Sequence, residues 1–137
     1  MTNAQSQAHQ QLIASAIAQF DDGDFREAVV LAHIAVEMVA DQTLGRWIET
    51  VTPVGLQAWL LKQVENNHNL GTTKALKLYE SLSSDMISES QFWPDFVTGN
   101  HLRNDIMHEG ADVSRDQADL VIKNAQLVIG HLLASKS

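Results

Sequence analysis

The sequence predicts an all-α fold, and three observations support this prediction. Apolar residues recur at three- and four-residue spacing along several segments, which is the period of one helix face. No segment alternates apolar and polar residues for long enough to indicate a β-strand. The pair Ser114 and Gln117 forms a capping box directly before the last apolar stripe. We therefore expect an up-and-down bundle of four main helices, with one or two shorter helices in the long middle connection.

The first two helices are expected to form an antiparallel hairpin. One face of the first carries Leu12, Ile13, Ala16, Ile17 and Phe20. Residues 21–24, Asp-Asp-Gly-Asp, then supply a helix stop, a turn and a new N-cap. The second helix is expected from about Phe25 to about Thr43, with Gly45 ending or bending it and residues 46–48 forming a continuation or a packed turn. Because it is apolar around most of its circumference, it belongs at the centre of the bundle or at a subunit interface.

Two short helices are expected in the middle of the chain. Thr52-Pro53 is typical of a helix start, with Thr accepting backbone N–H groups and Pro in the first helical position. Residues 66–71 are expected to form a loop. Thr72 or Thr73 then caps a helix that residues 83–85 close or redirect.

The last two segments complete the predicted bundle. Residues 92–107 form an apolar segment, and Glu109-Gly110 follows it at once. The final helix begins at the capping box and carries one apolar stripe to the C-terminus. A helix junction is therefore expected near residue 110, and reactive side chains are often displayed at such junctions.

Composition limits the classes of protein to be considered. With 137 residues, 45% of them apolar, the chain suits one domain over residues 1–137. No run of 18 apolar residues and no secretory leader is visible, so we expect a cytoplasmic protein without a membrane anchor. The absence of Cys excludes disulfides, thiolate metal sites and cysteine nucleophiles.

The charge of the chain restricts how it can bind nucleic acid. Nine Lys and Arg against 17 Asp and Glu give a formal charge of −8. This is the wrong sign for holding DNA or RNA by bulk electrostatics. If the ligand is nucleic acid, recognition must therefore depend on a few local cations.

Residues 103–108, Arg-Asn-Asp-Ile-Met-His, form the main candidate site. They combine a permanent cation, an amide and the side chain that titrates near neutrality, which suits holding a phosphate and moving a proton beside it. On a continuous helix Asn104 and His108 share a face, but Arg103 and His108 are about 140° apart. Either the helix ends before His108, as Gly110 would allow, or a second copy of the chain completes the site. The alternative interpretation is a plain helix C-terminus, where basic groups stabilise the helix dipole.

The same motif carries a family resemblance. Residues 101–110, followed by a single amphipathic helix, resemble the signature of the HEPN superfamily (higher eukaryotes and prokaryotes nucleotide-binding). Arg103, Asn104 and His108 match its Arg, polar residue, three variable residues and His. Residues 27–37 resemble the family's Ala-rich second helix with an embedded acid, here Glu37. With the order of the helices, the resemblance covers nearly the whole chain.

The resemblance implies a homodimer in which both subunits contribute Arg103 and His108 to one shared cleft. Many members of the family are metal-independent endoribonucleases, so the implied ligand is RNA or a nucleotide, with no metal and no cofactor. Arg103 and His108 would be catalytic, and Asn104 and Glu37 would support them. The protein would then be a toxin or a defence component, with an antitoxin protein as a partner in the toxin case.

Several alternatives remain open from the sequence. The chain can be a non-catalytic HEPN-like module that binds a nucleotide, an RNA end or a protein, or a plain helical interaction protein. Glu37 can pair with Arg103, hold a His across the cleft, or lie exposed at one edge of its helix. His33 and Glu37 are spaced like metal ligands, but the sequence places no third ligand, so no metal site is expected. Tryptophans 47, 59 and 93 are expected to be core or interface anchors.

Overall fold

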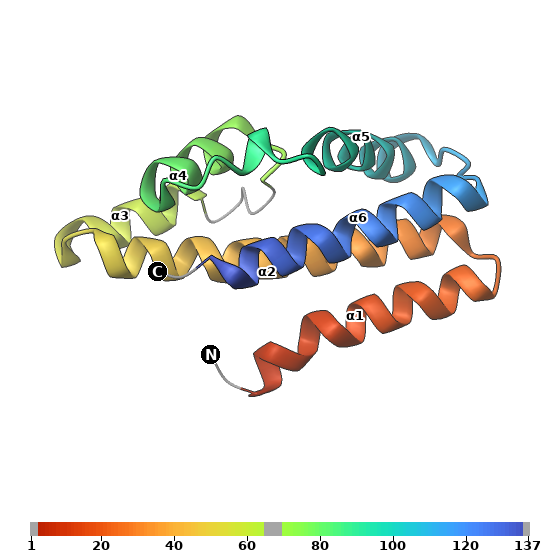
Figure 1. The fold of residues 1–137 in the computed structure, drawn as a ribbon, viewed down its shortest axis with the longest axis horizontal. Helices are drawn as coiled ribbons and strands as arrows, with labels where there is room; N and C mark the ends of the chain where they lie inside the picture. Colours follow the sequence, from red (N-terminus) through yellow and green to blue (C-terminus); the bar gives the residue numbers. More distant parts are fainter. Residues whose placement is uncertain (1–2, 65–69, 136–137) are drawn as a thin grey trace.

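The structure is a computed structural model, and it describes residues 3–64 and 70–135. These residues form six α-helices and one 3₁₀ turn, with no strand among them: α1 (Asn3–Asp21), α2 (Phe25–Val51), α3 (Val54–Val64), α4 (Thr73–Ser83), η1 (Ile87–Glu89), α5 (Trp93–Glu109) and α6 (Arg115–Ala134) (Figure 1). The all-α prediction is confirmed. Of the residues expected to form a loop, 66–69 lie outside the described residues.

The expected hairpin between α1 and α2 is present. Gly23 adopts φ +84°, a conformation that glycine reaches without steric cost. Its N–H donates to the Phe20 carbonyl at 3.0 Å, and the Asp24 N–H donates to the Gln19 carbonyl at 2.8 Å. These two bonds are the paired C-terminal cap of α1. The chain therefore reverses at once, and α1 packs along α2.

Helix α2 is the central element and is longer than expected. It runs through Gly45 to Val51, so the expectation that it ends near Thr43 at Gly45 is wrong, and the expectation that residues 46–48 continue the helix is confirmed. Leu44 and Ile48, on either side of the glycine, are both buried. Their burial contributes about 1.5–3 kcal/mol each, which exceeds the cost of about 1 kcal/mol for an interior glycine.

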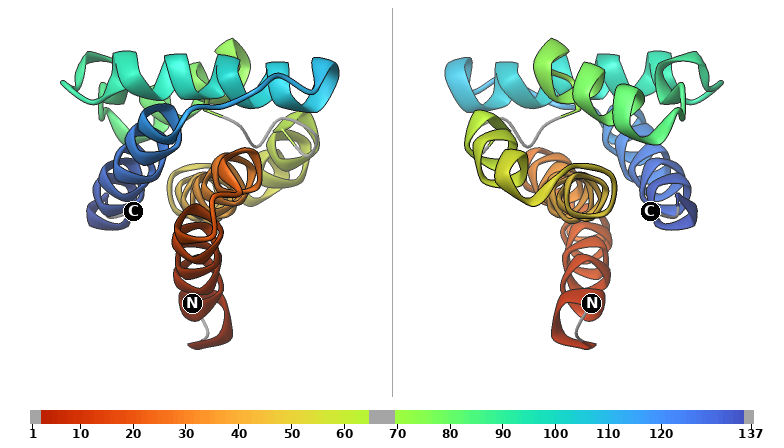
Figure 2. Two further views of the ribbon diagram at one scale, coloured as in Figure 1. Left: turned by 90° about the vertical axis from the view of Figure 1, so that its right-hand side faces the viewer. Right: turned by 90° about the vertical axis from the view of Figure 1, so that its left-hand side faces the viewer.

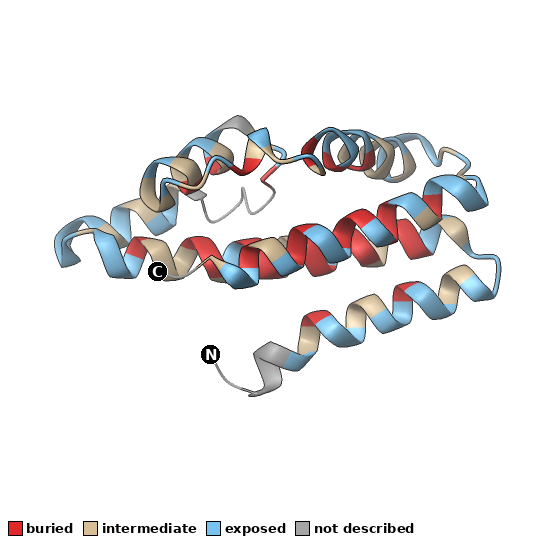
Figure 3. Ribbon diagram, in the orientation of Figure 1, coloured by how far each residue is buried: buried red, intermediate tan, exposed pale blue. Residues whose placement is uncertain are grey.

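By length and composition alone, α2 could cross a membrane. In the fold most of its apolar residues are buried, and 56% of its most apolar window is covered. Figure 3 shows α2 and α6 as the most buried helices of the described chain. The apolar character of α2 is therefore explained by its position in the core of the bundle.

The start of α3 differs from the sequence expectation. Thr52 caps the end of α2 in an extended conformation, and its hydroxyl donates to the Ile48 carbonyl instead of accepting N–H groups of α3. The Pro53 carbonyl accepts the Gln57 N–H at 3.2 Å, so Pro53 precedes the helix, which begins at Val54. The hydroxyl of Thr52 belongs to the preceding helix because the two helices are separated by only two residues.

The predicted ends of α4 and α6 are confirmed. Thr72 occupies the N-cap position of α4, without a side-chain capping hydrogen bond, and α4 ends at Ser83 with Ser84 at φ +61°. The Gln117 N–H donates to the Ser114 hydroxyl at 3.1 Å, and the Ser114 N–H donates to the Gln117 side chain at 2.9 Å. The capping box therefore fixes where α6 begins.

Helix α5 crosses α2 and α6 on one side of the molecule, whereas α1 lies on the other side of α2 (Figure 2). The core between these layers consists mainly of residues from α2 and α6. Phe96 and Trp93 of α5 are buried against it, and their rings lie 4.8 Å apart between centroids. This contact holds the N-terminal half of α5 on the bundle and so positions the candidate motif in its C-terminal half.

Candidate functional site

Helix α5 continues through the whole motif. It ends at Glu109, and Gly110 adopts φ +64°. The Gly110 N–H donates to the Ile106 carbonyl at 3.0 Å and the Ala111 N–H to the Asp105 carbonyl at 3.3 Å. A glycine in the left-handed conformation therefore ends this helix as one ends α1, with hydrogen bonds that each span one residue more. The alternative in which the helix ends before His108 is therefore wrong. Arg103 and His108 point to different sides of α5, and one chain alone does not bring them together.

Arg103 contacts α2 through Glu37. Its Nη2 atom lies 3.1 Å from Glu37 Oε1, and each side chain is 24% exposed. The two groups are close enough for an ion pair but are not aligned for a hydrogen bond, and Glu37 Oε1 has no hydrogen-bond partner. Of the alternatives for Glu37, pairing with Arg103 is the one present. The pair joins the two segments that carry the family resemblance.

The Arg103 guanidinium retains unused donor capacity. Its Nη1 reaches Asn104 Oδ1 only at 3.5 Å, the outer limit of a hydrogen bond. Its Nε is buried and has no hydrogen-bond partner. A guanidinium carries five N–H donors, so this one can still donate to an anionic oxygen while Glu37 holds one end of it.

His33 lies beneath this ion pair, one helical turn before Glu37. Its side chain is buried, and burial together with the neighbouring charge of Arg103 lowers the pKa of His33 from 6.5 to about 4, although a hydrogen bond to the Gly99 backbone opposes this. The ring is therefore neutral near pH 7. It packs against Phe96, with 5.9 Å between ring centroids.

From the sequence, His33 was considered only as a metal ligand, and no third ligand could be placed beside it. Within the described residues no group of three or more His, Cys, Asp or Glu is placed to hold a metal. One feature of the sequence could have indicated the close contact with His33. Gly99 is a glycine in the interior of a helix, and such a glycine often marks a close approach between elements. A Cβ there would meet His33 Nε2 at 3.2 Å and Val121 Cγ2 at 3.4 Å.

His108 is exposed in the last turn of α5, and Asn104 is half-buried on the same face. Met107, next to His108, is 59% exposed. The imidazole is thus accessible to a ligand at the end of the helix. Arg103 and Glu37 form a half-buried pair, and His108 stands apart from that pair in the same chain.

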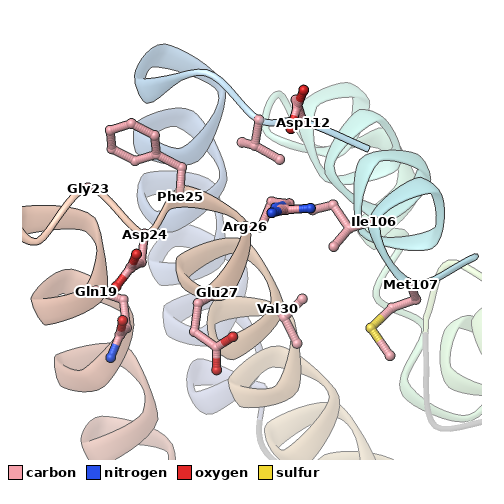
Figure 4. Close-up of a pocket in the computed structure, with 11 residues that line it drawn as sticks. Gln19, Gly23, Asp24, Phe25, Arg26, Glu27, Val30, Ile106, Met107 and Asp112 are labelled. Carbon is pink, nitrogen blue, oxygen red and sulfur yellow. The ribbon is translucent and has the colours of Figure 1, made fainter. Parts of the chain in front are cut away.

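A cavity of about 720 Å³ lies beside the end of α5 (Figure 4). It is lined by Ile106 and Met107 from α5 and by residues of α2 and the two neighbouring turns. Arg26 crosses between the helices and donates to the Gly110 carbonyl at 3.1 Å, which stabilises the helix end. Asp24, Glu27 and Asp112 also line the cavity. Three carboxylates outweigh one guanidinium, so this cavity does not attract phosphate.

A second polar cluster lies near the C-terminal end of α6. Asp85 Oδ2 accepts the Tyr79 hydroxyl at 2.6 Å and also lies 2.6 Å from His131 Nε2. Burial and the bond to Asp85 raise the pKa of Tyr79 to about 12. The Trp47 indole N–H donates to the Ser135 hydroxyl at 3.1 Å nearby. The sequence did not pair His131 with any residue, because 46 positions separate it from Asp85. Through the contact between His131 and Asp85, the cluster links α6 to the connection that follows α4.

The three tryptophans divide between core and surface. Trp93 is buried, Trp47 is partly buried, and Trp59 on α3 is 57% exposed. Trp59 therefore does not anchor the core of this chain, and only its expected role at an interface stays open.

Comparison of the chain with protein-family models, with curated protein sequences and with solved structures found no match.

Proposed function

We propose that this protein is a metal-independent endoribonuclease with a HEPN-like helical bundle, acting as a homodimer in the cytoplasm. Arg103 and His108 of both subunits would face one shared cleft, and Asn104 and Glu37 would support them. The observation that carries the proposal is the state of Arg103. Its guanidinium is held by Glu37 at Nη2, and the side chain is still 24% exposed, so N–H donors that Glu37 does not use can reach a bound anion.

Arg103 is suited to stabilise a phosphate in the transition state. A guanidinium fixed by a neighbouring carboxylate loses little conformational freedom when it binds, so its remaining donors are already oriented. His33, whose pKa is lowered to about 4, is neutral near pH 7 and so does not repel the guanidinium. The local cation can therefore bind one phosphodiester even though the chain as a whole carries −8.

His108 is suited to move protons. An accessible imidazole can accept the proton of a ribose 2′-OH. The 2′-oxygen then attacks the adjacent phosphorus, the bond to the 5′-oxygen breaks, and a protonated imidazole returns a proton to that oxygen. The products are a 2′,3′-cyclic phosphate and a 5′-OH. DNA lacks the 2′-OH and would not be cut.

The proposal of a dimer is supported by exposed apolar side chains on α2, α3 and α5. Ile34 on α2, Trp59 on α3 and Met107 on α5 are 36%, 57% and 59% exposed. Figure 2 shows α3 and the C-terminal end of α5 on the same side of α2. A second copy covering this side would bury these residues and bring a second Arg103 and His108 near the first pair.

The proposal is tested by RNA cleavage in the presence of a chelator. The wild-type protein is expected to cut structured RNA, and His108→Ala and Arg103→Ala are expected to reduce the rate at least 100-fold. The matched control is His101→Ala, which removes another exposed imidazole from the same helix and is expected to leave the rate unchanged. Cleavage that survives His108→Ala excludes His108 as the required proton carrier.

A toxin or defence role has its own test. Expression of the wild-type chain is expected to arrest growth, and Arg103→Ala is expected to relieve the arrest. An antitoxin, if the chain is the toxic half of a pair, would be recovered as a protein that restores growth and binds the wild-type chain. Arrest that persists with Arg103→Ala would separate toxicity from this site.

The second candidate function is a non-catalytic HEPN-like module that binds a nucleotide or RNA. It is favoured by one observation: within a chain, Arg103 is already paired with Glu37 and is separated from His108 around the helix. In that case a nucleotide would raise the unfolding temperature without any cleavage. A chain that shows neither cleavage nor a thermal shift would instead be a helical interaction protein.

A further inference from the structure

A groove between α1 and α6 lies away from the proposed catalytic cleft. Figures 1 and 2 show α1 and α5 on opposite sides of α2. The groove contains a cavity of about 280 Å³, lined by His9, Gln10, Ile13, Gln126, Ile129 and Gly130. Helix α1 packs along α2 and leaves this side, toward α6, partly open.

Two features of the groove show that its packing is incomplete within one chain. His9 is only 5% exposed, yet its buried Nδ1 has no hydrogen-bond partner. A buried imidazole nitrogen without a partner is unfavourable, and it lines the cavity. Gly130 lies within α6, where glycine lowers helix stability, and a Cβ added there would meet nothing within 4 Å. No neighbour in the chain therefore requires a glycine at this position.

The groove is also free of charge. Residues 3–19 contain no Asp, Glu, Lys or Arg, and neither do the residues that line the cavity. The whole chain carries −8, so two copies repel one another over most of their surfaces. Contact between copies is favoured where this repulsion is weakest. The apolar side chains Ile17 on α1 and Leu133 on α6, each 40% exposed, supply surface to bury there.

We propose that α1 of a second copy packs into this groove about a two-fold axis, so that α1 and α6 of both copies form a four-helix layer. In such an interface both copies contribute the same surface patch, and two uncharged patches do not repel one another. The glutamine side chains of the copy supply amides that can bond to His9. This interface is separate from the cleft of Arg103 and His108 and does not rest on the proposed function.

The experiment is a measurement of molar mass by sedimentation equilibrium on the full chain. Gly130→Glu places a charge and a long side chain in the groove, and the mass is expected to fall to half that of the wild type. Gly130→Ala adds only a methyl group and is expected to keep the wild-type mass. Leu127→Glu is the matched control, because Leu127 is an exposed apolar residue of α6 outside the cavity lining. Circular dichroism confirms that each variant is helical.

Met107→Glu, on the side of the proposed cleft, separates the two interfaces. If both exist, the wild type exceeds a dimer, each single variant is a dimer, and the double variant with Gly130→Glu is a monomer. If the cleft interface fails and the groove interface holds, the wild type is a dimer that only Gly130→Glu dissociates. A monomeric wild type, or a wild-type assembly that Gly130→Glu leaves intact, would overturn the inference.

Discussion

Gly99 of α5 lies so close to His33 of α2 that a Cβ at position 99 would be 3.2 Å from the imidazole Nε2. His33 is buried, and its ring is hydrogen-bonded to the Gly99 backbone. The close approach lets Arg103, one turn further along α5, reach Glu37, one turn further along α2. The geometry of the candidate site thus depends on a glycine outside the motif.

Gly99→Ala is expected to destabilise the protein by up to about 2 kcal/mol. Alanine gains about 1 kcal/mol in helix propensity, but the methyl group presses on the buried His33 ring and on Val121, and overpacking of this kind costs about 1–3 kcal/mol. Urea unfolding measures the change. Gly130→Ala is the control, because a Cβ there meets nothing and the propensity gain should appear as added stability. An equal increase in stability in Gly99→Ala and Gly130→Ala would mean that α5 can move away from α2.

Stability is expected to fall as the pH falls from 6.5 to 4 because of His33. Its pKa is about 4 in the folded chain and 6.5 when exposed, so in this range the unfolded chain binds a proton that the folded chain does not. The stabilising difference is fully present above pH 6.5 and is lost progressively below it, amounting to about 3 kcal/mol at pH 4.

Urea unfolding at a series of pH values measures this loss. His33→Gln is expected to flatten the dependence between pH 4 and 6.5, whatever its effect on absolute stability. His101→Gln removes an exposed histidine of α5 and serves as the control. An unchanged slope in His33→Gln would show that other groups cause the acid sensitivity.

The ion pair between Arg103 and Glu37 is expected to show a coupling free energy of about 1 kcal/mol in a double-mutant cycle. Both side chains are mostly shielded from water, and removing either charge leaves the other without its charged partner. The cycle combines Arg103→Gln and Glu37→Gln. Asp119 and Lys123 on α6 form the comparison pair, since they are 2.8 Å apart but largely exposed, and their coupling should be at most about 0.5 kcal/mol. Zero coupling at Arg103 and Glu37 would mean that the contact does not hold the guanidinium.

Asp85→Ala is expected to reduce stability by about 2 kcal/mol. One carboxylate oxygen serves both the Tyr79 hydroxyl and the His131 ring, and its removal leaves the buried hydroxyl of Tyr79 without that partner. Thermal unfolding measures the change. Asp119→Ala, which removes an exposed carboxylate from α6, should shift stability by no more than about 0.5 kcal/mol. Equal effects of the two substitutions would contradict a fastening role for Asp85.

The helical class and most of the local chain geometry can be predicted from the residue pattern alone. Period-3.6 stripes define α1, α2 and α6, Gly23 and Gly110 supply the left-handed conformations that end two helices, and Ser114 with Gln117 starts the last one. These features are encoded within a few residues of one another, so a linear pattern suffices to predict them. The motif of Arg103, Asn104 and His108 was visible for the same reason.

Contacts between residues far apart in the sequence could be identified only from the tertiary structure. Gly45 does not end α2, because Leu44 and Ile48 are buried against other elements and outweigh its low propensity. Pairing of Arg103 with Glu37, and of His131 with Asp85, depends on how helices cross. Crossing geometry is set by side-chain packing between segments far apart in the chain, and a pattern within one segment carries no information about it.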